Sequence, residues 1–342
     1  MRSIVEALCS KRCAGRKPGT PEGIAARLEV ASALRDAGLD PFEQEVPACR
    51  GANVIATLPG DIDRWVLVGA HFDHLGKAGD QVFWGADDNA AAVAILVEVA
   101  RGLARRRPAG RGVILASFDG EEPPHFLTKA MGSEHFVRTP TAPLDRIDMM
   151  VCMDLVGHAF GGEGVPDDVR ASLFALGAER SAGTADHVER IARVEPGVIV
   201  RPADVEIIPP LSDYAAFWRR NRPFVFLTAG RWQHYHTPTD TPEKLDYRKM
   251  AATARWLERF VRETCARPED SITFIKDGSG DAATLRSLID MTTSLTAISP
   301  EAGQGRAYAE SLLACCDEEG RLPASRRGEL GMLVGMLESR LS

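Results

Sequence analysis

The stretch RGVILASFDGEEPPHF, residues 111–126, predicts both a buried strand and the chemistry at its end. Residues 113–118 are almost all apolar, which is typical of a strand covered on both faces. Glu121 and Glu122 follow this strand. Two like charges there are costly unless something positive shares them, and a divalent metal with a bound water would do so. We therefore expect one glutamate to be a metal ligand and the other a base.

Similar apolar runs alternate with amphipathic segments along most of the chain. Further strands are predicted at residues 53–58, 64–74, 149–157 and 224–230. Helices are predicted at residues 24–38, 90–107, 133–138, 167–179 and 212–220. The alternation favours an α/β fold with a mostly parallel central sheet flanked by helices. In such sheets, sites form beyond the carboxyl ends of the strands.

The pattern changes near residue 267, after which only helices are expected. We predict a catalytic domain at residues 1–266 and a C-terminal helical appendage at residues 267–342. The amphipathic faces of the appendage could pack on the catalytic domain or on a second subunit. Intramolecular packing is the favoured alternative, and a homo-oligomer through these helices stays open.

Composition narrows the class of protein. The net charge of −7 is modest and the basic residues are dispersed, so no nucleic-acid partner is expected. Seven cysteines without a CxxC pair argue against a disulfide framework. The N-terminus lacks the apolar core of a signal peptide, and no stretch approaches the length of a membrane span. A soluble cytoplasmic protein without a membrane partner is the simplest interpretation.

Polar clusters lie at the ends of four further predicted elements. In HFDH, residues 71–74, His71 is a candidate ligand and Asp73 would hold its imidazole, while His74 is interpreted as a surface residue. In GADDNAAAV, residues 85–93, one of the two aspartates is expected to cap the following helix and the other to bridge two cations.

The later clusters are MDLVGH, residues 153–158, and HYHTPTDT, residues 234–241. Asp154 stands in an apolar run, so it needs a metal or a hydrogen-bond network, and His158 could be its partner or unrelated. His234 and His236 are two apart and should point to opposite sides of an extended segment, and we favour His236. Nitrogen and oxygen donors together suit zinc, and five ligands with one shared carboxylate suit two ions.

The ordered set of motifs resembles the co-catalytic dinuclear zinc aminopeptidases, a family that also includes the glutaminyl cyclases. The resemblance covers about three quarters of the chain. It is carried by the segments AGRKPGT, NVIATLPG, VLVGAHFDH, GADDNAAAV, FDGEE, MGSEHF, MDLVGH, SDYAAF and YHTPTDT. A zinc exopeptidase-like fold is therefore expected.

The resemblance also implies roles. Asp88 would bridge two zinc ions, with His71 and Asp154 completing one site. Glu122 and His236 would complete the other. Cobalt or manganese could occupy the same ligands. Three residues are expected to be catalytic: Glu121 as general base and then acid, Asp73 as the partner of His71, and Tyr235 as support for the tetrahedral intermediate.

The function expected from these roles is hydrolysis of the N-terminal peptide bond of peptides with a free N-terminus. A single-zinc glutaminyl cyclase is the first alternative, because the segment PPHFLTKAM, residues 123–131, is longer than in ordinary aminopeptidases. The presence of His71 speaks against it. An inactive binding module is the second alternative, and the intact Glu121 speaks against that. The helical appendage has no counterpart in the family pattern.

Overall fold

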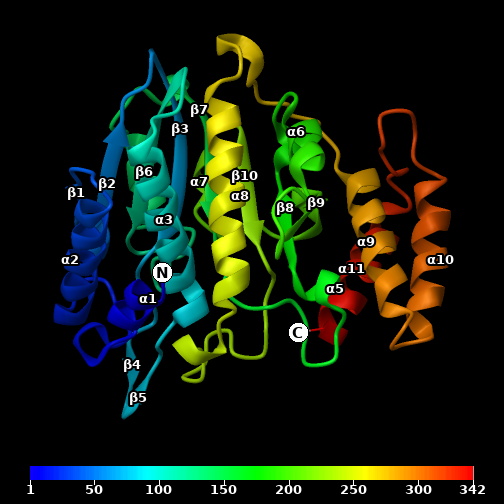
Figure 1. The fold of residues 1–342 in the computed structure, drawn as a ribbon, viewed down its shortest axis with the longest axis horizontal. Helices are drawn as coiled ribbons and strands as arrows, with labels where there is room; N and C mark the ends of the chain where they lie inside the picture. The colour runs from blue at the N-terminus through cyan, green and yellow to red at the C-terminus, as the bar shows by residue number, and fades with distance from the viewer. Residues whose placement is uncertain (342) are drawn as a thin grey trace.

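The computed structural model describes residues 1–341, and its centre is an eight-stranded sheet within that range (Figure 1). The strands follow the order β1-β2-β6-β3-β7-β10-β8-β9. Their bounds are β1 (Phe42–Val46), β2 (Gly51–Leu58), β3 (Ile62–His71), β6 (Arg111–Phe118), β7 (Ile147–Met153), β8 (Ser172–Leu176), β9 (Ile199–Ala203) and β10 (Phe224–Thr228). A short hairpin, β4 (Lys77–Ala78) and β5 (Gln81–Val82), stands apart from it.

The middle of the sheet is parallel and its flanks are mixed. β6, β3, β7 and β10 run in the same direction, whereas β2 and β8 run antiparallel to their inner neighbours. Every residue of β6 and β7 is buried, as expected for strands covered on both faces. The predicted fold class is confirmed, and the carboxyl ends of the four inner strands share one edge.

Helices cover both faces of the sheet and create two separate apolar cores. One core is formed with α1 (Arg2–Leu8), α2 (Pro21–Asp36), α3 (Ala91–Arg105), α6 (Thr184–Ile191) and α8 (Tyr247–Cys265). The other is formed with α4 (Gly132–Arg138) and α7 (Tyr214–Trp218). Figure 1 shows α2, α3 and α8 side by side over the near face. Local sequence explains two of their starts, because Thr20 and Asp246 accept backbone N–H bonds as N-caps of α2 and α8.

One predicted helix is wrong. Residues 167–179 form only the short α5 (Asp167–Arg170) and then strand β8. The helix-like start is real, since two aspartates follow Pro166, but β8 pairs with both β9 and β10. Those ladder bonds outweigh the local preference. Strands β1, β8 and β9 and helix α8 were not predicted, and β3 and β7 end earlier than expected.

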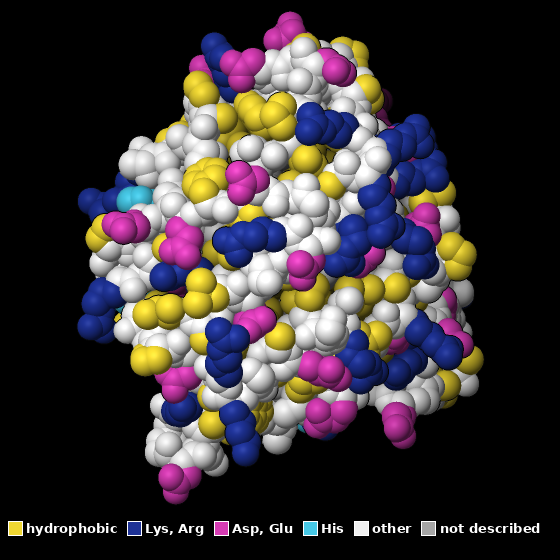
Figure 2. Space-filling model, turned by 60° about the vertical axis from the view of Figure 1, so that its left-hand side comes forward, with side chains coloured by type: hydrophobic (Ala, Val, Ile, Leu, Met, Phe, Trp, Pro, Cys, Tyr) yellow, Lys and Arg dark blue, Asp and Glu magenta, His cyan; other side chains and the backbone are white. Residues whose placement is uncertain are grey.

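Beyond α8 the chain is helical. The segments are α9 (Asp281–Leu295), α10 (Glu301–Leu313) and α11 (Arg327–Leu341). α9 packs against β9 and the three helices share a small core around Leu285, Leu312 and Leu330. C-terminal helices are thus present, while a domain boundary at residue 266 stays a prediction. Across the face in Figure 2, basic and acidic side chains are interspersed. Within residues 1–341, no helix is both long and apolar enough to cross a bilayer.

Candidate metal centre

The five predicted ligands meet beyond the carboxyl ends of the inner strands. His71 is the last residue of β3, and Asp154 directly follows β7. Glu122 lies three residues after Asp119, which follows β6, and His236 lies in the loop after β10. Asp88 belongs to the irregular turn that enters α3. Parallel strands thus bring together side chains that are far apart along the chain.

One half of the centre, here the His71 half, contains His71, Asp88 and Asp154 and is deeply buried. His71 Nε2 lies 3.5 Å from Asp88 Oδ1 and 3.6 Å from Asp154 Oδ1. Among residues 1–341, His71 Nε2 and Asp154 Oδ1 are buried atoms without a hydrogen-bond partner. Such atoms are rare because an unsatisfied buried polar group is costly. A cation between them would satisfy both, so these donors fit a metal ion.

The other half, here the His236 half, contains Asp88, Glu122 and His236 together with His74. His236 Nε2 lies 3.1 Å from Asp88 Oδ2 and 3.2 Å from Glu122 Oε2. The interpretation of His74 as a surface residue is wrong, because it is fully buried and its Nδ1 lies 2.7 Å from Glu122 Oε1. His74 is therefore either a further ligand or the group that orients Glu122. His234 instead bonds to Thr239 near the surface.

Asp88 faces both halves, one carboxylate oxygen toward each. Its backbone is fixed by Asp240, whose buried carboxylate accepts the N–H groups of Asp87 and Asp88 at 2.9–3.1 Å. The expected helix cap is not found, since Asp87 accepts N–H bonds from Gly157 and His158 and contacts His158 Nδ1 at 2.6 Å. His158 is thus the partner of Asp87 rather than of Asp154.

Asp73 has a wider role than the sequence suggested. Its backbone carbonyl lies 3.3 Å from His71 Nδ1, and its carboxylate lies 3.6 Å from the same atom. The carboxylate also accepts the backbone N–H groups of Glu121 and Glu122 at 3.0 and 3.1 Å. Asp73 therefore positions the imidazole and the glutamate pair at once, a link between β3 and β6 that no local motif reveals.

Arg16 joins the N-terminal loop to the same region and was not singled out from the sequence. It is fully buried, and its guanidinium donates to the carbonyl oxygens of Phe72, Trp84 and Gly85 at 2.6–2.8 Å. A longer bond of 3.2 Å reaches the carbonyl of Asp88. Five donors on one planar group suit this task. Arg16 thus fixes the turns that carry His71 and Asp88.

The ionisation of the two halves differs. Burial would lower the pKa of His71, but the carboxylates of Glu121 and Asp154 outweigh it and raise that pKa well above its ordinary value. Burial raises the pKa of Glu121, and Asp154 and Glu122 raise it further against the opposing effect of His71.

In the His236 half, burial opposes ionisation of Glu122, yet its hydrogen bonds to His236 and His74 lower its pKa to about 2. Burial also opposes protonation of His236, but hydrogen bonds to Asp88 and Glu122 raise its pKa to about 10. A bound cation would neutralise the same carboxylates and would displace these protons.

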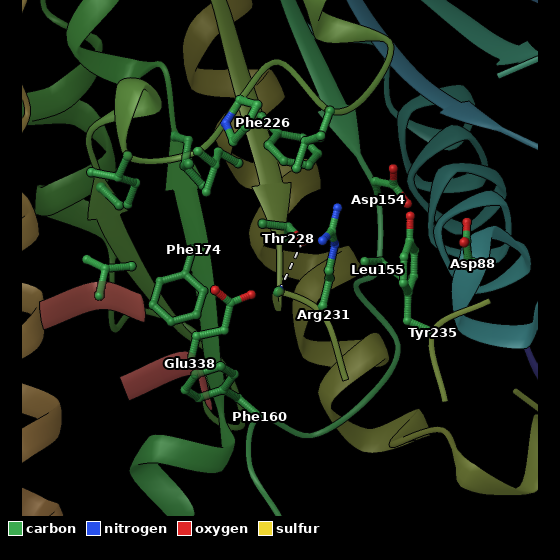
Figure 3. Close-up of a pocket in the computed structure, with 18 of the residues that line it drawn as sticks. Asp88, Asp154, Leu155, Phe160, Phe174, Phe226, Thr228, Arg231, Tyr235 and Glu338 are labelled. Carbon is green, nitrogen blue, oxygen red and sulfur yellow. Dashed lines mark hydrogen bonds between the residues drawn. The ribbon is translucent and has the colours of Figure 1, made fainter. Parts of the chain in front are cut away.

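Beside the centre lies a cavity of about 370 Å³, within the usual size of a small-molecule pocket. Glu121, Asp154 and Tyr235 reach it, and Figure 3 shows Asp88, Asp154 and Tyr235 on one side of it. The Tyr235 ring stacks on His236 at 3.9 Å between centroids. Burial raises the pKa of the Tyr235 hydroxyl still further above neutral pH.

Comparison with known protein families shows to which family the chain belongs. The model of peptidase family M28 matches residues 53–261. The chain belongs to peptidase family M28. The expected resemblance is confirmed, since the M28 family holds zinc-dependent aminopeptidase-like enzymes and glutaminyl cyclases. Zinc is thus the metal of the family, and the site described above offers residues able to hold it.

Relatives and solved structures point to both activities of the M28 family. The uncharacterized protein YfbL of Escherichia coli is 29% identical over 61% of this chain and 70% of its own length. The glutaminyl-peptide cyclotransferase of Drosophila melanogaster is 26% identical over 72% of this chain and 77% of its own length.

Among solved structures, the LapA aminopeptidase of Legionella pneumophila is similar with a TM-score of 0.63 and 16% identity, covering 78% of this chain and 72% of that chain. The glutaminyl cyclase of Porphyromonas gingivalis is similar with a TM-score of 0.61 and 22% identity, covering 77% of this chain and 96% of that chain. At these identities the likeness shows the shared fold.

Proposed function

We propose that this M28 protein is an aminopeptidase that uses two zinc ions to hydrolyse the N-terminal peptide bond of peptides. The observation that carries the proposal is the His71 half. Its two unpartnered buried atoms, within the part of the chain that the structure describes, would serve as ligands for a second ion.

The bound ions would polarise the scissile carbonyl and lower the pKa of water toward neutrality. Glu121 is the general base of this proposal, because its Oε2 lies 3.7 Å from His71 Nε2 and its side chain reaches the cavity. It accepts the proton of the attacking water and then delivers it to the leaving amine. Asp73 holds the backbone of Glu121 during both transfers.

Tyr235 is proposed to donate a hydrogen bond to the oxyanion of the tetrahedral intermediate. Its phenol is a hydrogen-bond donor at neutral pH, burial raises its pKa further, and it lines the cavity beside Asp154. The free amine of the substrate is proposed to bind at the carboxylates of the centre, which would restrict hydrolysis to chain ends. Removal of one such oxyanion donor typically costs about 10²–10³ in kcat.

The test is a pair of neighbouring substitutions. Glu121→Gln should lower kcat by about 10³-fold or more while two zinc ions per chain are retained, because a base is lost and no ligand. Glu122→Gln is the matched control and should lose zinc as well as activity. Metal content by elemental analysis and amino-acid release from a dipeptide panel are measured together. Wild-type turnover in Glu121→Gln would refute the role of Glu121.

Glutaminyl cyclisation is the second candidate, favoured by the similarity to curated glutaminyl-peptide cyclotransferases over 72% of the chain. It would need one ion, held by the His236 half. A peptide with N-terminal glutamine separates the two reactions, since cyclisation releases ammonia and hydrolysis releases free glutamine. Ammonia release with a single bound zinc would decide for the cyclase.

A further inference from the structure

The C-terminal helices form part of the wall of the substrate cavity. The catalytic part contributes aromatic residues such as Phe160, Phe174 and Phe226. The appendage contributes apolar residues of α9 and α11, namely Leu288, Met291, Val334 and Leu337. Figure 3 shows Glu338 of α11 near Phe160 and Phe174, away from Asp88 and Asp154. The metal centre and the appendage thus lie on different sides of one cavity.

The wall is held in place by polar bonds to the catalytic part. Thr284 Oγ1 accepts the N–H of Asp204 at 2.8 Å, and Ser287 Oγ donates to the carbonyl of Pro202 at 2.8 Å. At the start of α11, Arg327 pairs with Glu206 at 2.8 Å and with Asp204 at 3.4 Å. A wall fixed by these contacts is in position before a ligand arrives, which lowers the entropy cost of binding.

α11 divides its side chains between the appendage core and the cavity. Leu330 and Leu333 are buried in the core of the appendage. Val334 is half-buried, and it packs at the margin of that core and also lines the cavity. Met332, in contrast, is 62% exposed, so it lies outside both. A change at Val334 therefore alters the cavity directly, and the same change at Met332 does not.

We propose that α9 and α11 are the specificity-determining wall of the active site, enclosing a large apolar side chain on the N-terminal residue of the substrate. This inference rests on the proposed aminopeptidase function and names its substrate class. The family match ends at residue 261, so the wall comes from outside the segment that defines the family. An apolar cavity of about 370 Å³ beside the ligands offers room for such a group.

The test measures discrimination between large and small ligands, with and without catalysis. The substitution Val334→Phe fills the cavity from α11, and Val334→Ala enlarges it with little risk to folding. Zinc-loaded protein is titrated with leucine hydroxamate and glycine hydroxamate by calorimetry, and the hydrolysis of Leu-Gly and Gly-Gly is followed in parallel.

Val334→Phe should weaken leucine hydroxamate about tenfold while the Kd of glycine hydroxamate stays unchanged, because single methylenes in such pockets are worth about tenfold or more. Val334→Ala should weaken the binding of leucine hydroxamate by a few-fold. The control Met332→Phe, on the outer face of the same helix, should change the affinity for neither ligand.

The two proposals fail in different ways. The proposed wall would be refuted if both Val334 variants left the ratio of the affinities for leucine and glycine hydroxamate unchanged, even if peptides are hydrolysed. If no peptide is hydrolysed but the hydroxamate ratio depends on Val334, the wall is supported and the aminopeptidase proposal fails.

Discussion

The His71 half and the His236 half of the metal centre share Asp88 but neutralise their charges differently. In the His71 half, two buried ligand atoms have no hydrogen-bond partner among residues 1–341. In the His236 half, the His236 imidazole pairs with Asp88 and Glu122 and its side chain is 29% exposed, while His74 Nε2 is buried without a hydrogen-bond partner in that same range. A cation would satisfy the unpartnered atoms of the first half, whereas in the second half it would replace the closer pairing of His236 with its two carboxylates. Equal numbers of ligands thus do not imply equal sites.

The largest expected effect comes from removing the residue that both halves share. Asp88→Ala should lower zinc content at both positions and reduce kcat/KM by about 10³-fold or more, because each ion loses a carboxylate. Zinc per chain and turnover are measured after dialysis against a fixed free zinc concentration. A variant that still holds two ions would mean that Asp88 bridges nothing.

The second prediction contrasts the halves in the metal-free protein. His71→Ala leaves Asp154 and Glu121 buried without their imidazole and should cost about 3 kcal/mol of unfolding free energy. His236→Ala leaves Glu122 with its bond to His74, so it should cost less, about 1–2 kcal/mol. Urea unfolding in the presence of a chelator gives both values. Equal losses would show that the two halves do not differ in this respect.

The third prediction concerns protons. The pKa of His236 is raised to about 10, so its ion pairs stabilise the metal-free fold fully below the ordinary histidine pKa and lose that effect as pH rises through 10. Zinc needs the neutral imidazole, so binding near pH 7 should release about one proton from each of His71 and His236. Zinc affinity should then fall about tenfold per released proton for each unit of acidification.

Calorimetry of zinc binding in buffers with different ionisation enthalpies counts these protons. His236→Gln is the matched variant and should release about one proton fewer. Zinc uptake without proton release would contradict the charge pairing of the His236 half.

The smallest expected effect is at Asp240, which holds the turn of Asp88 without facing an ion. Asp240→Ala removes the acceptor of two buried N–H groups and should weaken zinc binding by about tenfold or more. Asp246→Ala is the control, since it removes only the N-cap of α8 and should leave zinc affinity unchanged. Equal affinities in the two variants would assign Asp240 a purely structural role.

The ligand positions were predictable because they follow apolar strands, and strand ends of a parallel sheet converge. His71, Glu122 and Asp154 illustrate this directly. His74 was misinterpreted because a side chain next to a strand end gives no local sign of burial. Its contact with Glu122 joins residues 48 positions apart, and no periodicity reports such a distance.

The errors in the fold have a similar cause. The segment at β8 begins like a helix and becomes a strand only because β9 and β10 lie beside it. The wall formed by α9 and α11 was also beyond sequence reasoning. Leu337 belongs to an apolar face at helical spacing, and such a face does not show which surface the helix packs against.

The buried guanidinium of Arg16 has a consequence for how the catalytic unit is delimited. The family match begins at Asn53, yet the turns on both sides of the metal centre are fastened to a loop well before that residue. A shortened protein that starts at Asn53 would keep every predicted ligand. It would lose Arg16, which aligns the turns that carry them. The segment that the family model matches is therefore shorter than the part of the chain that holds the metal centre in place.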